Sequence, residues 1–335
     1  MKDFLDLADL SPAGVRELVA LAGRLERKPE PSALYGKVLG LMFLNPSLRT
    51  LASFQAGMAR LGGHSFVISP GASWQLEYRA DVPMTGDAAE HIREALPVLA
   101  SYADVLGVRS FAGGRDLQTD LGEPVFQAIR DLCPVPLINM ESATNHPCQA
   151  LADWKTLDDL DVPTHSGRFV LSWANHPKAL PLAVPAAVAH MAAMRGMDLT
   201  ILRPPGFELP PAIMGLVGEA AAASGGRVTE TADREAAMDG AHVLYAKSWA
   251  ATRAYGDAAA DAALRADLDD WTVAEPWFRP ADPGCVFMHC LPVRREVVVT
   301  TEVLEGPRSR VIPQARNRMY AQMAVLYRLL LGEGD

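Results

Sequence analysis

Short apolar runs alternate with longer amphipathic stretches along much of this 335-residue chain. Each run has the length of a buried strand, and each intervening stretch places apolar residues at helical spacing. This alternation is typical of parallel sheets, because a helix usually carries the chain back between parallel strands. The predicted strands are Val38–Leu44, Ser65–Ile68, Val105–Ser110, Pro136–Met140, Phe169–Trp173, Leu199–Arg203, Arg227–Thr231, His242–Ala246 and Val286–His289. The predicted helices between them are 51–61, 89–102, 122–132, 179–195, 211–224 and 233–239.

The series of strands is interrupted at His146–Leu160, which reads as one long helix with a proline in its first turn. A chain of this length exceeds most single hydrophobic cores. We therefore predict an α/β fold with two doubly wound parallel-sheet domains joined by this helix. The expected domains are 1–150 and 151–314, with a C-terminal helix within 315–335 packing back onto the first. The alanine-rich stretches 219–223 and 258–263 are predicted to be surface helix without a functional role.

Composition narrows the class of protein. The formal net charge is −9, which argues against nucleic-acid binding because that function needs a basic surface. The four cysteines form no C-x-x-C pair and no zinc-like cluster with histidine, so no metal or other cofactor is expected. Residues 1–10 show no signal-peptide pattern, and no stretch reaches the roughly 20 apolar residues that span a membrane. We expect a cytoplasmic protein without a membrane partner.

The segment Asn45-Pro46-Ser47-Leu48-Arg49-Thr50 follows a predicted strand and opens a helix. A helix N-terminus offers free N–H groups and the positive end of the helix dipole. Hydroxyls and a guanidinium added there would make a cradle for phosphate. The alternative is an ordinary loop with a serine cap. Neither G-x-x-x-x-G-K nor G-x-G-x-x-G occurs, which argues against binding of a nucleoside triphosphate or a dinucleotide.

Three further segments follow predicted strands, where ligands bind in open α/β sheets. Arg109 ends a strand, although a lone arginine is more often a surface ion-pair partner. His146-Pro147-Cys148-Gln149 offers an imidazole for hydrogen bonding or proton transfer and an amide acceptor, or else merely caps the helix. In His289-Cys290-Leu291-Pro292 the proline favours extended geometry, which would present the Leu291 carbonyl. Cys290 taken alone reads best as a buried thiol.

In this order, the four segments resemble the aspartate/ornithine carbamoyltransferase superfamily, over nearly the whole chain. Several segments are more similar to its N-acylornithine branch: Asn45-Pro46, Trp173–Lys178, Ala246–Trp249 and Leu291–Arg295. The D-x-x-x-S-M-G loop that holds free ornithine is absent, and Lys247-Ser248-Trp249 stands in that region. An acylated nitrogen needs no carboxylate partner, whereas an acyl carboxylate would require lysine or arginine.

The resemblance implies roles for individual residues. Those expected to bind carbamoyl phosphate are Ser47, Leu48, Arg49, Thr50, Trp74, Arg109, His146, Gln149, Cys290, Leu291 and Arg318. Those expected to bind N-acylornithine are Ala89, Glu141, His176, Lys247, Leu291 and Arg294. Arg49, Thr50, Arg109, His146 and Cys290 form the expected catalytic set. Trp74 resembles a tryptophan that reaches into a neighbouring subunit's site, which implies a homotrimer.

Three positions depart from the family pattern. Leu51 replaces the usual arginine after S-x-R-T, which puts local interface contacts in doubt. Ala89 stands where acetylornithine enzymes carry a glutamate, and Val298 stands where they carry a lysine. A glutamate would repel a succinyl carboxylate and alanine would leave room for it. N-succinylornithine is therefore the favoured acceptor, with N-acetylornithine retained.

The expected reaction is carbamoyl transfer to the neutral δ-amine, with phosphate leaving, as a step of arginine biosynthesis. Guanidinium and imidazole groups would stabilise charge on the carbonyl and on the leaving phosphate. The alternatives are carbamoylation of ornithine or another amine, a cysteine hydrolase using Cys290 with His289 or His146, and a non-catalytic sensor of carbamoyl phosphate or an amino acid.

Overall fold

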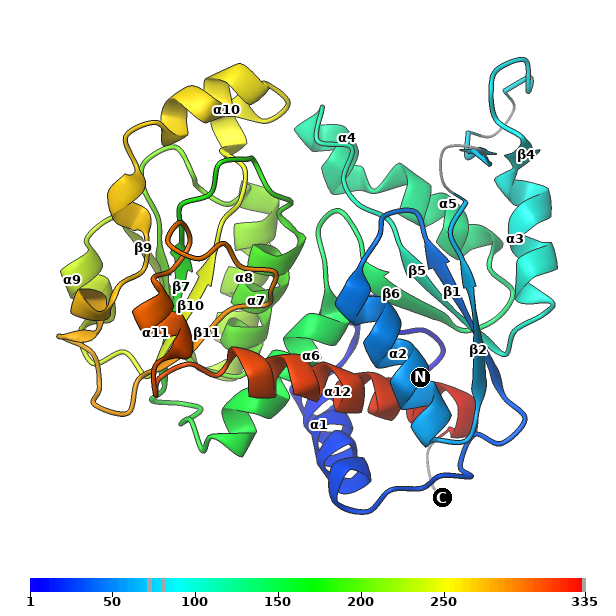
Figure 1. Cartoon of the computed structure of the whole chain (residues 1–335), viewed down its shortest axis with the longest axis horizontal. Helices are drawn as coiled ribbons and strands as arrows, with labels where there is room; N and C mark the ends of the chain where they lie inside the picture. The colour runs from blue at the N-terminus through cyan, green and yellow to red at the C-terminus, as the bar shows by residue number, and fades with distance from the viewer. Residues whose placement is uncertain (71–73, 80–81, 333–335) are drawn as a thin grey trace. The chain divides into compact units, whose positions relative to one another are not determined.

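The computed structural model describes residues 1–70, 74–79 and 82–332 (Figure 1). The chain divides into two compact units. The first unit comprises Met1–Ala112, Gln118–Cys148 and Arg318–Asp335, and the second comprises Gly113–Leu117 and Gln149–Asn317. Within the described ranges, no helix is both long enough and apolar enough to cross a membrane.

The first unit is built on a four-stranded parallel sheet in the order β2-β1-β5-β6. Strands β1, β5 and β6 are buried over nearly their whole length, which explains their continuous apolar runs. The chain adds β2 on one side of β1 and β5 on the other, so the winding reverses between β1 and β5. The strands are β1 Val38–Phe43, β2 His64–Ile68, β5 Val105–Arg109 and β6 Leu137–Glu141, and a separate parallel pair is β3 Leu76–Glu77 with β4 Glu90–His91.

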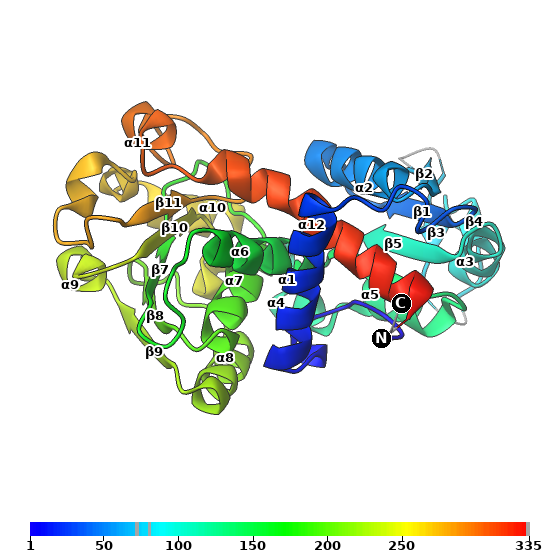
Figure 2. The same ribbon diagram turned by 90° about the horizontal axis from the view of Figure 1, so that it is seen from below.

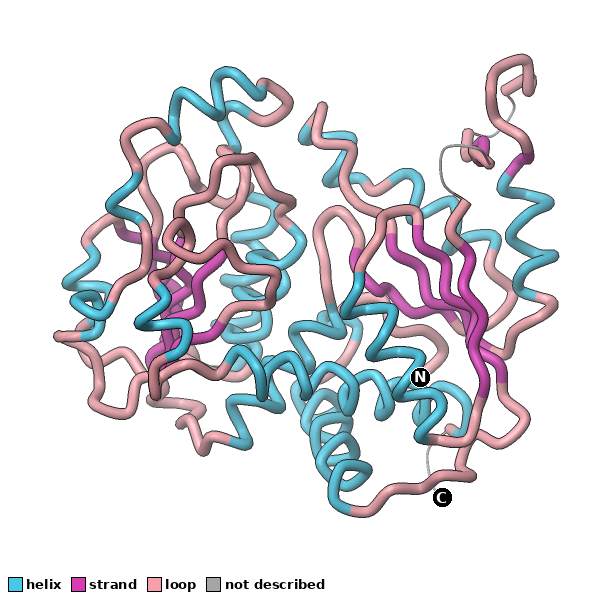
Figure 3. Tube along the Cα trace, viewed as in Figure 1, coloured by secondary structure: helices cyan, strands magenta, loops and turns pink. Residues whose placement is uncertain are grey.

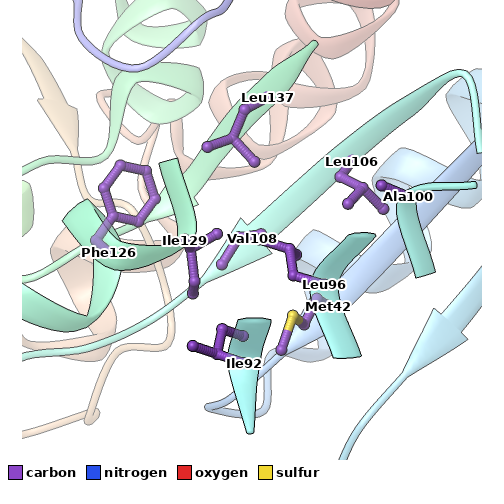
Figure 4. Close-up of a cluster of buried hydrophobic side chains, with 9 residues drawn as sticks. All are labelled: Met42, Ile92, Leu96, Ala100, Leu106, Val108, Phe126, Ile129 and Leu137. Atoms are coloured by element: carbon purple, nitrogen blue, oxygen red, sulfur yellow. The ribbon is translucent and has the colours of Figure 1, made fainter. Parts of the chain in front are cut away.

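Helices cover the sheet of the first unit. Figure 4 shows side chains of α3 (Ile92–Ala100) and α5 (Pro124–Leu132) packed on strand residues such as Met42 and Val108. Burying one large apolar side chain contributes about 1.5–3 kcal/mol, so this cluster anchors both helices. The other helices that belong wholly or mostly to this unit are η1 Leu7–Asp9, α1 Pro12–Arg27, α2 Leu48–Arg60 and α4 Leu117–Gly122.

The second unit contains a five-stranded parallel sheet in the order β11-β10-β7-β8-β9, coloured magenta with the other strands in Figure 3. Its winding reverses between β7 and β10. The strands are β7 Arg168–Trp173, β8 Asp198–Leu202, β9 Arg227–Thr231, β10 Val243–Lys247 and β11 Val286–Met288. The helices are α7 Ala183–Met194, α8 Pro211–Ser224, α9 Arg234–Met238, α10 Ala258–Arg265 and α11 Thr301–Glu305, with short 3₁₀ helices η2 Thr252–Ala254, η3 Asp269–Trp271 and η4 Glu275–Phe278.

Two helices pass from one unit into the other: α6 (Pro147–Asp159) and α12 (Val311–Leu331). In the first unit, Figures 1 and 2 show α1 beside the C-terminal part of α12. There the Arg24 guanidinium lies 5.3 Å from the centroid of the Tyr327 ring, and Arg328 pairs with Glu17 at 3.5 Å. The C-terminal helix therefore packs onto the first unit as predicted.

The predicted fold class is confirmed: two α/β units with parallel sheets flanked by helices. Every predicted strand is present, with ends that differ from the prediction by no more than one residue. One expectation needs correction. The stretch 258–263 is helical and mostly exposed, but Asp261 is buried, as is Arg265 one turn later, so this helix has an inward polar face.

Candidate active site

The loop that follows β1 is closed by a serine cap. Ser47 precedes α2, and its Oγ accepts a hydrogen bond from the Thr50 N–H at 3.4 Å while donating to Thr50 Oγ1 at 3.0 Å. Thr50 is fully buried, whereas the Leu48 side chain is 79% exposed. Only the backbone of Leu48 therefore suits the binding role expected of it. The capped turn directs N–H groups and a hydroxyl to the carboxyl end of β1.

Arginine side chains gather near this turn. Arg318 of α12 donates from Nη2 to Thr50 Oγ1 at 2.7 Å. Arg109 ends β5, and its guanidinium lies 4.4 Å from the centroid of the Phe111 ring. Burial lowers the pKa of Arg109, opposed by Glu141, and the positive charges of Arg318 and Arg49 lower it further. Three guanidinium groups of the first unit thus lie within electrostatic reach of one another.

Glu141 lies among these groups, although it was expected to bind the acylated amino acid. Its carboxylate accepts from Arg109 Nη1, and its Oε2 lies 3.3 Å from His146 Nε2. A register shift at Val108/Arg109 in the β5–β6 pairing brings Arg109 opposite Glu141. In this structure Glu141 is therefore a partner of residues expected to bind carbamoyl phosphate.

His146 is a neutral imidazole at pH 7. Burial lowers its pKa well below the usual 6.5, and the charges of Arg318 and Arg109 lower it further. Neutral histidine carries one ring N–H, and the contact with Glu141 places it on Nε2, which leaves Nδ1 as an acceptor. Three buried atoms here have no hydrogen-bond partner among the described residues: His146 Nδ1, Arg109 Nε and Arg318 Nε. Buried polar atoms normally have partners, so this is a polar site suited to a small anion.

A second cationic cluster surrounds His176 in the second unit. His176 follows β7, Lys247 ends β10, and these strands flank the reversal of the winding. Arg294 donates from Nε to His176 Nε2 at 3.2 Å. Burial lowers the pKa of His176, and the charges of Lys247, Arg294 and Arg265 contribute in the same direction. The positive charges of Lys247 and Arg294 beside this imidazole make an environment suited to a carboxylate.

The segment after β11 is fixed by hydrogen bonds within the second unit. Leu291 was expected to be extended before Pro292, but its φ of 55° lies in the left-handed region, and its N–H donates to His289 Nδ1 at 2.9 Å. The His289 N–H donates to Gln314 Oε1 at 3.0 Å, and Gln314 Nε2 donates to Asp153 Oδ1 at 2.7 Å. Gln149 Nε2 also donates to Asp153 Oδ1, at 2.8 Å, and its buried Oε1 has no described partner. That oxygen can accept from a substrate amide.

Trp74 and Ala89 lie near the two short strands β3 and β4. The Trp74 side chain is 54% exposed and donates from Nε1 to Glu90 Oε2 at 3.2 Å. Ala89 is exposed, and its N–H donates to the Gln75 carbonyl at 2.9 Å. Residues 71–73, directly before Trp74, lie outside the described residues. These contacts tie Trp74 and Ala89 to their own segment rather than to the arginine cluster.

Comparison with known proteins places this site in a family. The description "Aspartate/ornithine carbamoyltransferase, carbamoyl-P binding domain" matches residues 2–159, and the companion "Asp/Orn binding domain" matches residues 184–329. The chain belongs to the aspartate/ornithine carbamoyltransferase family. It is 37% identical to an N-acetylornithine carbamoyltransferase of Xanthomonas campestris over 334 residues, covering 98% of each chain. An N-succinylornithine carbamoyltransferase of Bacteroides thetaiotaomicron is 38% identical over 300 residues, covering 88% of each.

Solved structures agree with this membership. A crystal structure of acetylornithine transcarbamylase complexed with acetylcitrulline matches this carbamoyltransferase with a TM-score of 0.94 and 37% identity, covering 98% of this chain and 99% of that one. A variant of N-acetyl-L-ornithine transcarbamylase with a glutamate replaced by alanine, complexed with carbamyl phosphate and N-succinyl-L-norvaline, matches equally well at 38% identity, covering 98% of this chain and 100% of that one.

The geometry of this carbamoyltransferase gives no support to a cysteine hydrolase. That alternative assigned the nucleophile to Cys290, which is buried, with His289 or His146 as its base. His289 Nδ1 accepts from a backbone N–H, and His146 Nε2 lies against Glu141. Neither nitrogen is arranged as the base of a thiol. Among the described residues, no group of three or more His, Cys, Asp or Glu side chains could hold a metal ion.

Sequence reasoning missed polar residues that support these loops. Gln314 and Asp153 carry the hydrogen bonds beneath Leu291, and Asp261 with Arg265 binds the loops after β7 and β10. The spacing of Asp261 and Arg265, four residues apart on a helix, was the available signal for an ion pair. The alanines between and before them made the stretch resemble a plain surface helix.

Proposed function

We propose that this carbamoyltransferase moves the carbamoyl group of carbamoyl phosphate onto the δ-amine of an N-acyl-L-ornithine, giving N-acylcitrulline and phosphate in arginine biosynthesis. N-Succinylornithine is the preferred acceptor and N-acetylornithine the next. The observation that carries the choice of acceptor is the cationic surrounding of His176, where Lys247 and Arg294 are positioned to meet a carboxylate. The family relatives that act on acylated ornithines support the same choice.

The first unit is the proposed carbamoyl-phosphate domain. The α2 N-terminus with Ser47, Leu48, Arg49 and Thr50 binds the phosphate, together with Arg318 and, from a neighbouring subunit, Trp74. Arg109 and His146 bind the carbamoyl end. The proposal is supported by the buried Nε atoms of Arg109 and Arg318, which have no described partner and are donors for anionic oxygens.

The second unit is the proposed N-acylornithine domain. Lys247 and Arg294 bind carboxylate oxygen of the acceptor, with His176 orienting Arg294, and Ala89 of the first unit lines the acyl group. The backbone at Cys290 and Leu291 lies beside the attacking amine, and Gln149 accepts from the carbamoyl amide. Glu141 acts on the acceptor indirectly, because its carboxylate already orients Arg109 and His146.

The proposed reaction needs no covalent enzyme intermediate. The lone pair of the neutral δ-amine attacks the carbamoyl carbon, and the bond from that carbon to the phosphate oxygen breaks. Phosphate leaves with the electron pair, and the proton lost by nitrogen goes to the phosphate or to water. Arg49, Thr50 and Arg109 stabilise the charge on the carbonyl and the leaving group, while His146 accepts from the carbamoyl amide through Nδ1. Each such donor is worth about 3–4 kcal/mol of barrier.

The preference for the succinyl compound depends on Ala89 and Val298. We take Ala89 to correspond to the glutamate that is replaced by alanine, proline or valine in solved transcarbamylase variants complexed with N-succinyl-L-norvaline. A small apolar residue leaves room for the succinyl carboxylate and removes a like charge. Val298 is 2% exposed, which suits an apolar residue but not the lysine of acetylornithine enzymes.

The test is product formation with three acceptors. Purified enzyme is incubated with carbamoyl phosphate and, separately, N-succinylornithine, N-acetylornithine and ornithine, and the ureido product is measured. The succinyl compound is expected to give the highest kcat/KM. Ala89→Glu is expected to reverse the preference towards the acetyl compound, by about 1–3 kcal/mol of discrimination.

Ala88→Glu is the matched control, because it adds the same charge one residue away. Equal loss of succinyl preference in both variants would mean that charge in this region, and not the Ala89 position, decides the acyl group. Turnover of free ornithine alone would overturn the acylornithine proposal. Binding of carbamoyl phosphate without any turnover would support the sensor alternative.

A further inference from the structure

Helix α10 contains a buried ion pair of Asp261 and Arg265, whose side chains are 4% and 6% exposed. The two residues lie four apart, so they share one face of the helix. Removing two charges from water is unfavourable, and a buried ion pair is therefore weak evidence of a stabilising role. The groups that Asp261 and Arg265 bind give a better reason for the ion pair than stability does.

Every N–H of the Arg265 guanidinium has a partner. The Nε donates to Asp261 Oδ2, and Nη2 donates to Asp261 Oδ1 at 3.1 Å and to the Trp249 carbonyl at 2.9 Å. The Nη1 donates to Ser248 Oγ at 3.1 Å and to the His176 carbonyl at 3.4 Å. Only a planar guanidinium carries five donors in this fixed arrangement.

Aromatic rings and a further hydrogen bond hold the pair in place. The Arg265 guanidinium lies 5.4 Å from the ring centroid of Trp173 and 5.1 Å from that of Phe207. Asp261 Oδ1 also accepts from the Ala251 N–H at 2.8 Å. Arg265 thus has no free donor for a substrate, and its side chain is buried.

The pair joins two loops that carry proposed acceptor residues. One loop follows β7 and contains His176, and the other follows β10 and runs from Lys247 through Ser248 and Trp249. Both strands end at the reversal of the sheet winding. The two loops are therefore fixed to each other through one guanidinium.

We propose that Asp261 and Arg265 are positioning residues for acceptor specificity: they hold the His176 and Lys247 loops at the spacing that binds the N-acylornithine carboxylate. The inference rests on the function proposed above. Arg265 binds no substrate itself, and carbamoyl phosphate binding in the first unit does not depend on it.

Arg265→Lys tests this role, because it keeps the positive charge and loses the planar set of donors. We expect KM for the N-acylornithine to rise about 10-fold or more, with KM for carbamoyl phosphate changed less than about 2-fold. The succinyl-to-acetyl ratio of kcat/KM is expected to fall, because misplaced cations discriminate less between the two acceptors. Ser248→Ala, which removes a single acceptor of Arg265, is expected to give a smaller change in the same direction.

Arg195→Lys is the matched control. Arg195 is also a buried arginine of the second unit, donating to Asp158 at 2.8 Å and to the carbonyls of Val162 at 2.7 Å and Pro163 at 3.2 Å. It holds a different loop. We expect a lower melting temperature without a change in acceptor KM or acyl ratio.

The outcomes separate the two proposals. If the wild-type enzyme turns over another amine instead, N-acylornithine is not the acceptor. The same variants, assayed with that amine, would then test whether Arg265 positions the acceptor-binding loops. Two results would show that Arg265 has only a structural role. One is an equal rise in the KM values for both substrates. The other is a fall in kcat that accompanies a fall in melting temperature like that expected for Arg195→Lys. If Arg265→Lys does not fold, Ser248→Ala decides alone: an unchanged acceptor KM and acyl ratio would overturn the proposal.

Discussion

His146 lies fully inside the first unit, where burial, Arg318 and Arg109 hold the pKa of its imidazole well below its usual range. Below pH 6.5 the unfolded chain binds a proton that the folded chain does not. Stability is therefore lost as pH falls from 6.5 towards the folded pKa, by up to about 1.4 kcal/mol per pH unit from this residue.

His146→Gln should remove that contribution. We expect the loss of stability between pH 7.5 and 5.5 to be smaller in the variant than in the wild type, measured as the change in denaturant midpoint. His64→Gln, at an exposed histidine, is the control for the substitution itself. An identical pH dependence in all three proteins would contradict the assignment of a neutral buried imidazole.

The contacts of single residues were the feature that the sequence predicted least well. Arg109 at a strand end and His146 at a helix start could be selected from their places in the chain. The contact of both with Glu141 could not, because it depends on a register shift between β5 and β6 that leaves no mark in composition. The lowered pKa of His146 depends on the same three-dimensional arrangement.

Helix α2 links local sequence to the proposed phosphate site. Ser47→Ala removes the hydroxyl that caps the helix and holds Thr50, and we expect about 1 kcal/mol of lost stability together with a higher KM for carbamoyl phosphate. Ser11→Ala is a matched variant, because Ser11 caps α1 through the Gly14 N–H at 3.1 Å. It should show a similar fall in melting temperature and an unchanged KM. A KM unaffected by Ser47→Ala would exclude the side chain from phosphate binding.

Elements were predicted well where burial dictates their sequence. Continuous apolar strands such as β5 and β10 leave little choice of structure, and their ends were found within one residue. Helix α10 shows the limit of this reasoning. Its alanines gave the right secondary structure, but the burial of Asp261 and Arg265 depends on aromatic side chains from distant segments.

At the scale of the whole molecule, we propose a homotrimer in which each Trp74 completes a neighbour's site. The exposed side chains of Trp74 and Leu48 are consistent with such a contact. Trp74→Ala should fold normally and bind carbamoyl phosphate more weakly. Light scattering should give three times the 36.1 kDa chain mass.

Co-expression of Trp74→Ala and Arg318→Ala chains gives a stricter test. Each variant alone should be nearly inactive, while a mixed trimer should regain one active site, where intact residues from two chains meet, so that random assembly restores about a quarter of all sites. Activity no greater than that of either variant alone would mean that each subunit supplies its own complete site.

The arginine cluster of the first unit has a consequence for anyone handling the protein. Arg49, Arg109 and Arg318 repel one another, and Glu141 offsets only part of their charge. We expect any small dianion that enters to relieve this repulsion, so sulfate or phosphate in a buffer should act as a ligand and raise apparent stability. Phosphate is also the product of the proposed reaction. If the cluster binds carbamoyl phosphate as proposed, we expect buffer sulfate or phosphate to compete with it and to lower its apparent affinity.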